Sequence, residues 1–145
     1  MEFPVFTAVF AAVLIILQQI LMLSVGLHRA ATLRGVGVGD DATLLRKQRR
    51  HGNLSENSAI LIILIGLLEL TGASASAVLA FAALFLGGRV FHAIGFSFDA
   101  GASGTSLFAP PAIMRALGAF ATGLGGIAAA GYVLWLNWPS FAAVF

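Results

Sequence analysis

The sequence predicts an all-α integral membrane protein built as one bundle of four transmembrane helices. The chain has 145 residues, of which 59% are hydrophobic and only 10% are charged. Soluble domains contain about 45–50% apolar residues, so this composition excludes a water-soluble fold. The apolar runs are continuous, whereas the strands of a membrane barrel alternate over about ten residues. We therefore expect a single domain, residues 1–145, with spans at about residues 3–27, 42–71, 77–98 and 112–136.

Composition also limits the chemistry. The chain contains no cysteine, which excludes disulfides, cysteine nucleophiles and cysteine metal sites. Any thiol chemistry would have to use a thiol brought by a ligand. The net charge of +2 comes from one basic cluster, so it does not indicate a nucleic-acid-binding surface. We expect membrane lipid as a partner, with no metal and no nucleic acid.

The first span is long enough to cross a bilayer, and it lacks the basic start and cleavage pattern of a signal peptide. Gln18 shares one helix face with Met22, Val25 and Arg29. This face has two interpretations: Gln18 hydrogen-bonds to another helix, or the face lines a polar cavity that ends at Arg29. Residues 29–41 predict a glycine-rich loop, and Asp41 at its end suits the N-cap of the next helix.

The second span begins in the most charged run of the protein and continues into an apolar run. On a helix, Arg46, Arg49, Asn53 and Glu56 fall on one face, and Gln48 points elsewhere. An amide and a carboxylate at membrane depth are costly unless they are paired or wetted. Such a face can bind a zwitterionic, peptide-like molecule, because arginine holds carboxylates and glutamate holds an ammonium group. The alternative is a basic cluster that attracts anionic lipid, followed by an internal Arg–Glu ion pair.

The third span places Arg89, His92 and Phe96 on one face. A lone histidine in a helix is more often a packing residue than a ligand, but an arginine one turn away favours a site. Glu69, near the end of the preceding span, lies on a different face from Glu56. We expect Glu69 to be a carboxylate at the membrane interface.

The fourth span follows the glycine- and serine-rich loop 97–111, and Arg115 lies near its start. Its interior carries small residues four apart, and such spacing permits close helix contact. These pairs are Ala119 with Gly123, and Gly126 with Ala130. We expect an aromatic belt at the far membrane interface, formed by Tyr132, Trp135 and Trp138.

The distribution of basic residues predicts the orientation. Six Lys or Arg side chains lie between residues 29 and 50, and none lies in the turn at 72–76 or near either terminus. The positive-inside rule therefore puts the basic loop in the cytoplasm and both termini outside. In this arrangement seven polar residues from four helices converge at one membrane level: Arg29, Arg49, Asn53, Glu56, Arg89, His92 and Arg115.

Two motifs resemble those of the MAPEG family, the membrane-associated proteins in eicosanoid and glutathione metabolism. The run RKQRRHGNLSE resembles the family signature Arg-x-x-Arg-x-x-x-Asn-x-x-Glu, whose residues correspond to Arg46, Arg49, Asn53 and Glu56. The run GRVFHA matches the third-helix motif of the family through Arg89 and His92, and Arg115 stands where the family places an arginine. The loop GVGVGDDATLL is typical of bacterial members, which implies a bacterial inner membrane protein.

The resemblance implies a homotrimer that binds glutathione as a co-substrate at subunit interfaces near the cytoplasmic side. The implied glutathione-binding residues are Arg49, Asn53, Glu56 and His92, together with Arg29 and Arg89. Arg115 would stabilise the thiolate, because a nearby guanidinium favours the charged form of a thiol. The thiolate would then attack a lipophilic electrophile or reduce a hydroperoxide that enters from the bilayer.

The sequence also departs from the well-studied eicosanoid members of the family. Phe96 stands where they carry a tyrosine, Gly52 where they often carry a polar residue, and Asn57 where they carry an aromatic residue. Two alternatives therefore stay open beside a glutathione-dependent transferase or peroxidase. One is a non-catalytic lipid-binding or scaffold member of the same fold, and the other is a small transporter subunit.

Overall fold

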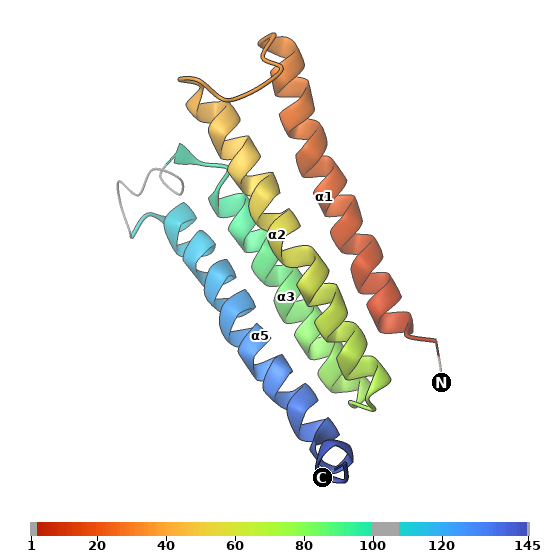
Figure 1. The fold of residues 1–145 in the computed structure, drawn as a ribbon. Coiled ribbons are helices and arrows are strands. Elements are labelled where there is room, and N and C mark those ends of the chain that lie inside the picture. Colours follow the sequence, from red (N-terminus) through yellow and green to blue (C-terminus); the bar gives the residue numbers. More distant parts are fainter. Residues whose placement is uncertain (1–2, 100–107, 145) are drawn as a thin grey trace.

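The structure is a computed structural model that describes residues 3–99 and 108–144. Its four helices are long and apolar enough to cross a membrane (Figure 1). They are α1 (Val5–Ala31), α2 (Ala42–Leu70), α3 (Ala75–Gly95) and α5 (Pro110–Ala142). The described residues contain no strand. The predicted four-helix membrane fold is therefore confirmed.

The helix ends differ from the expected ones. Helix α1 continues to Ala31, so Arg29 lies on the helix and not in the loop. No glycine or proline interrupts residues 27–32, and the Thr32 hydroxyl donates to the His28 carbonyl at 2.9 Å to complete the last turn. Helix α5 runs to Ala142, beyond the expected residue 136, and α3 ends at Gly95. Residues 100–107 of the predicted loop lie outside the described residues.

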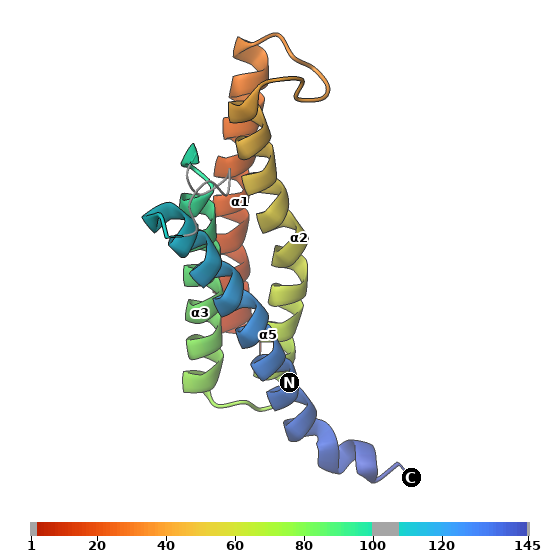
Figure 2. The same cartoon turned by 90° about the vertical axis from the view of Figure 1, so that its left-hand side faces the viewer.

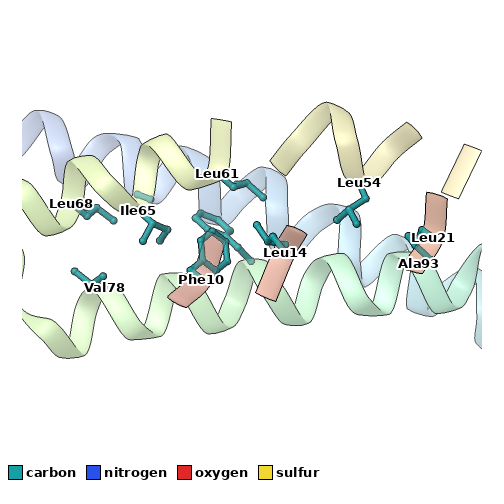
Figure 3. Packing of buried hydrophobic residues seen from close by; sticks show 11 residues of the cluster. Phe10, Leu14, Leu21, Leu54, Leu61, Ile65, Leu68, Val78 and Ala93 are labelled. Carbon is teal, nitrogen blue, oxygen red and sulfur yellow. The ribbon is translucent and has the colours of Figure 1, made fainter. Parts of the chain in front are cut away.

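The helices form two pairs that pack against each other. Helix α1 lies against α2, and α5 lies along α3, with α2 and α3 in contact between them (Figures 1 and 2). Buried leucines, isoleucine, valine and phenylalanines from α1, α2 and α3 form the core (Figure 3). The outer faces carry exposed apolar side chains, such as Ile127 at 72% and Leu134 at 70% exposure. An outer surface of this kind is stable in lipid, so the protein is integral to the membrane and contacts lipid.

Helices α3 and α5 approach each other closely through glycines. A Cβ atom at Gly118 would collide with the backbone of Gly88 and His92, and one at Gly95 would collide with Pro111. The buried stripe of α5 consists of Gly118, Thr122, Gly125 and Ala129. The small-residue pairs noted in the sequence, Ala119 with Gly123 and Gly126 with Ala130, are not part of this stripe, and a Cβ atom at Gly123 or Gly126 would meet nothing within 4 Å. Those residues lie on the neighbouring face of α5, which lines a groove. The spacing of small residues does not determine which face of a helix turns toward its neighbour.

Several polar contacts hold the helices together. The Asp41 side chain accepts a hydrogen bond from the Leu44 backbone N–H at 2.8 Å, which confirms Asp41 as the N-cap of α2. Gln18 Nε2 of α1 donates to Ser55 Oγ of α2 at 2.6 Å. Of the two interpretations of Gln18, the structure therefore supports a hydrogen bond between helices. Its Oε1 atom is buried without a partner in the described part of the chain.

The two ends of the bundle differ. The loop between α1 and α2 lies at the same end as the start of α5 and the end of α3 (Figure 1). Both termini and the turn between α2 and α3 lie at the opposite end. The polar residues predicted to converge lie toward the end with the α1–α2 loop.

Candidate functional site

A polar pocket of about 360 Å³ lies between α2 and the α1–α2 loop. Arg49, Asn53 and Glu56 line it from successive turns of α2, as their common face predicts. The other lining residues are Gly37, Val38, Leu45, Gln48, Gly52 and Phe96. The pocket thus offers a guanidinium, an amide and a carboxylate to one ligand.

The two charged groups of the polar pocket have no partner in the described part of the chain. Arg49 and Glu56 are both exposed, and neither makes a hydrogen bond or an ion pair there. They are separated by seven residues, about 10 Å along the helix axis, so they do not pair with each other. The internal ion pair considered as an alternative is therefore absent between them. Charges at membrane depth without partners inside the chain require a partner from outside it.

Arg29 shapes the rim of the polar pocket without lining it. Its Nη1 atom donates to the carbonyls of Arg34, Gly35 and Gly37 at 3.0–3.3 Å, and its Nη2 atom donates to Gln48 Oε1 at 3.4 Å. Gly37 and Gln48 are themselves lining residues. Arg29 therefore holds the loop against the start of α2.

A second, apolar groove of about 430 Å³ runs between α2 and α5, with α3 beneath it. One end is polar and contains Asn53, Asn57, Arg89, His92 and Thr122. The remainder is lined mainly by Ile60, Ile63, Leu64 and Leu67 of α2 and by Ala119, Gly123, Gly126 and Ala130 of α5. Because Asn53 lines both cavities, the polar pocket and the apolar groove adjoin each other at this residue.

Arg89 connects three helices below these cavities. It is only 3% exposed, and its Nη1 atom donates to Asn53 Oδ1 at 2.7 Å. Its Nη2 atom donates to the Gly118 carbonyl at 3.1 Å and to Thr122 Oγ1 at 2.5 Å. Both terminal nitrogens are therefore used inside the protein. The Nε atom is buried without a partner among the described residues.

His92 and Arg115 lie beside the two cavities. The buried His92 ring lies 5.0 Å from the Phe96 ring, centroid to centroid, and lines the groove. The Arg115 guanidinium lies 5.3 Å from the centroid of the same phenylalanine ring. Arg115 lines neither cavity and makes no hydrogen bond or ion pair with any residue that the structure describes. Phe96 thus contacts Arg115 and also lines the polar pocket.

Two further basic residues of α2 serve other contacts. Arg46, on the face predicted for the site, instead forms an ion pair with Asp99. Arg50 donates to Ser97 Oγ at 2.6 Å and to Ser24 Oγ at 3.0 Å, which links α2 to α1 and to the end of α3. Neither arginine lines the polar pocket.

Outside the spans, Asp41 belongs to a small polar cluster at the start of α2. The Leu44 backbone N–H, followed by the His28 side chain, holds the pKa of Asp41 below its usual value. His28 Nε2 lies 2.8 Å from Asp41 Oδ2, and Lys47 Nζ lies 3.2 Å from His28 Nδ1. This cluster joins the end of α1 to the start of α2.

The helix-face prediction missed part of the site. Gln48 was expected to point elsewhere, yet it lines the polar pocket because the α1–α2 loop supplies a second wall there. Gly37 and Val38 of that loop and Thr122 of α5 were not predicted either. No signal in the sequence identifies them, since their position depends on how the loop and α5 lie against α2.

Comparison with known protein families matches residues 7–136 to the MAPEG family. No curated protein and no solved structure matches the chain.

Proposed function

Because the chain belongs to the MAPEG family, we propose that it is a membrane-bound, glutathione-dependent transferase or peroxidase that acts on lipophilic substrates. One observation carries this proposal. A polar pocket with the unpartnered Arg49 and Glu56 adjoins an apolar groove at Asn53. A polar thiol and a lipophilic molecule would therefore lie next to each other, as a reaction between them requires.

Glutathione suits the polar pocket because it is a zwitterionic tripeptide. Arg49 holds a carboxylate and Glu56 holds the ammonium group, since guanidinium groups and carboxylates prefer these partners. Asn53 and His92 supply further hydrogen bonds from the boundary with the groove. Arg29 acts indirectly by holding the loop that lines the polar pocket, and Arg89 acts indirectly by orienting the side chain of Asn53.

In the reaction, Arg115 stabilises the thiolate of bound glutathione. A free thiol has a pKa of about 8.5, so it is mostly protonated at neutral pH, and a nearby positive charge favours the nucleophilic form. With an aryl halide, the sulfur forms a bond to carbon and the halide leaves. With a hydroperoxide, the sulfur attacks oxygen and the O–O bond breaks. For either reaction, Arg115 must reach the thiol from its position against Phe96, which lines the polar pocket.

The protein works as a homotrimer with the site near the cytoplasmic face of a bacterial inner membrane and both termini outside. Arg49 and Glu56 are exposed on a single chain, at a level where lipid is a poor partner for charge. A neighbouring subunit would cover the polar pocket and exclude lipid from it. The basic residues at this end of the bundle support the cytoplasmic orientation.

Purified protein in detergent tests the proposal. We expect glutathione to bind at millimolar concentration or below in calorimetry, and we expect conjugation of 1-chloro-2,4-dinitrobenzene. Absence of glutathione binding would exclude the proposed activity. Binding of lipid with no turnover would favour the scaffold alternative, and substrate-driven flux in liposomes would favour a transporter subunit.

Substitution of Arg115 tests its assigned role. We expect Arg115→Ala to lower kcat by about 100-fold or more, because removing a group that stabilises developing charge has effects of this size. The dissociation constant of glutathione should change less than about threefold, since Arg115 acts on the thiolate. Arg46→Ala is the matched control, because that arginine is paired with Asp99 outside the pocket. Equal losses in binding and turnover for Arg115→Ala would contradict the role.

A further inference from the structure

The polar end of the groove is lined by Asn53, Asn57, Arg89, His92 and Thr122. Two of these side chains are engaged by the protein itself. Both terminal nitrogens of Arg89 donate to protein acceptors. The Thr122 hydroxyl accepts from Arg89 and donates its proton to the Gly118 carbonyl at 2.9 Å. Three of the five N–H groups of Arg89 and the hydroxyl proton of Thr122 are therefore used inside the protein, so these two side chains mainly position the site.

Arg89 also determines which atoms of Asn53 remain available. A guanidinium group only donates hydrogen bonds, so the atom of Asn53 that faces it must be the carbonyl oxygen Oδ1. The amino group Nδ2 makes no hydrogen bond to the described residues, and it is not among their buried, unpartnered atoms. Asn53 thus presents N–H donors to the cavities that it lines.

Asn57 has the opposite polarity. Its Nδ2 atom donates to the backbone carbonyl of Asn53 at 2.8 Å. A carbonyl only accepts, so this bond fixes the side-chain amide with Oδ1 left over. This Oδ1 atom is also without a partner in the described residues and is not buried. Asn57 therefore presents an acceptor to the groove, one helical turn from the donors of Asn53.

We propose that this pair of asparagines binds the –OOH group of a lipophilic hydroperoxide, with Asn57 as the residue that determines this specificity. The terminal O–H donates to Asn57 Oδ1, and a peroxide oxygen accepts from one of the two N–H groups of Asn53 Nδ2, while the other N–H group donates to glutathione. The hydrocarbon part lies along the apolar remainder of the groove. An aryl halide has no proton for Asn57, and an ionised fatty acid has acceptors only. The inference rests on the proposed function, because bound glutathione is the reductant.

The reaction is balanced with two thiols. The glutathione thiolate attacks the terminal oxygen, and the O–O bond breaks. The leaving alkoxide takes up the proton that the first thiol released when it became a thiolate, and it leaves as an alcohol. The sulfenic acid formed on the first glutathione reacts with a second glutathione to give the disulfide and water. The hydroperoxide is reduced by two electrons, and the two thiols are oxidised.

Asn57→Leu tests the assignment, because it keeps the side-chain volume and removes the acceptor. We expect kcat/KM for cumene hydroperoxide to fall about tenfold, the effect of one hydrogen bond. We expect kcat/KM for 1-chloro-2,4-dinitrobenzene to stay within about twofold of wild type. Asn137→Leu is the matched control and should alter neither value of kcat/KM, because Asn137 makes the same kind of bond, to the Val133 carbonyl at 2.8 Å, but lines neither cavity. Equal losses for both substrates in Asn57→Leu would overturn the inference.

A second measurement uses the wild-type protein alone and does not depend on whether a variant folds. Decanol, which has an O–H donor, should inhibit hydroperoxide reduction at least threefold more strongly than its methyl ether, which has none. Equal inhibition would overturn the inference. A wild-type protein that conjugates the halide but reduces no hydroperoxide would also overturn it, with the proposed function intact. Absence of glutathione binding and of both activities would instead overturn the proposed function, and this inference with it.

Discussion

Helix α2 carries two glutamates near its opposite ends, and their surroundings differ sharply. Glu69 accepts hydrogen bonds from the backbone N–H groups of Phe6 at 3.0 Å and Thr7 at 2.8 Å, and from the Thr7 hydroxyl at 2.7 Å. Glu56 is exposed and has no hydrogen bond or ion pair within the described chain. Both are carboxylates in an apolar helix, yet only Glu69 is partnered by the fold.

Glu69 acts as the N-terminal cap of α1. The residue before that helix is Pro4, whose side chain makes no capping bond, so the first N–H groups of α1 depend on a residue from another helix. A negative charge is also favourable at this position because of the helix dipole. The interfacial carboxylate expected from the sequence is thus a link between α1 and α2.

This difference separates structural from ligand-binding polar groups inside the membrane. A buried or lipid-facing charge is costly when its hydrogen-bonding capacity is unused. Where the fold uses that capacity, as for Glu69, the residue stabilises the structure. Where the fold leaves it unused, as for Glu56, a ligand or a neighbouring subunit has to use it.

The largest effect is expected for binding at Glu56. Glu56→Gln should weaken glutathione binding about 10- to 100-fold, because a hydrogen bond to a charged group contributes about 1.5–3 kcal/mol. Thermal stability without ligand should stay equal or rise, since the variant removes an unpaired charge. Calorimetry and thermal unfolding in the same detergent measure the two quantities. A large loss of stability in the apo protein would mean that Glu56 has a structural partner.

A smaller effect is expected for Glu69, and it concerns stability instead of glutathione binding. Glu69→Gln should lower the free energy of unfolding by about 1 kcal/mol, the usual contribution of a helix cap. Glutathione affinity should stay within about twofold of wild type, because the residue lies at the other end of the bundle. Thr7→Ala removes only the hydroxyl bond and should be milder. The comparison fails if Glu69→Gln weakens glutathione binding as much as Glu56→Gln does.

The smallest effect on stability is expected for Asp41, a third carboxylate, which caps the start of α2 outside the membrane span. Because the folded pKa of Asp41 is lowered, its contribution to stability is present above its unfolded pKa of about 3.9. That contribution is lost as the pH falls through the lower folded pKa. The difference in melting temperature between wild type and Asp41→Asn should therefore be constant above about pH 5 and shrink in stronger acid. A difference that grows on acidification would contradict this assignment.

Much of the fold could be predicted from the sequence. The length of the apolar runs gave four membrane helices, because a bilayer of fixed thickness demands spans of about 20 residues. Helical spacing also grouped Arg49, Asn53 and Glu56, and these three line one pocket. Their role in binding glutathione stays a prediction.

The partners of each polar group could not be predicted. Helical spacing assigned Arg46 to the site and Gln48 to another face, whereas Arg46 pairs with Asp99 and Gln48 lines the pocket. Similarly, the spacing of small residues in α5 fitted two adjacent faces, and the structure buries the one that contains Gly118. These outcomes depend on the rotation and separation of neighbouring helices.

The sequence by itself therefore determined the fold class, the N-cap of α2 and the common face of Arg49, Asn53 and Glu56, because these depend on local periodicity and composition. Only the tertiary structure decided that Glu69 is used by α1 and Glu56 is left free. It also decided that Arg89 takes the carbonyl of Asn53 and leaves its amino group for a ligand. A hydrogen bond between helices requires two atoms about 3 Å apart, and no pattern within one helix specifies that distance.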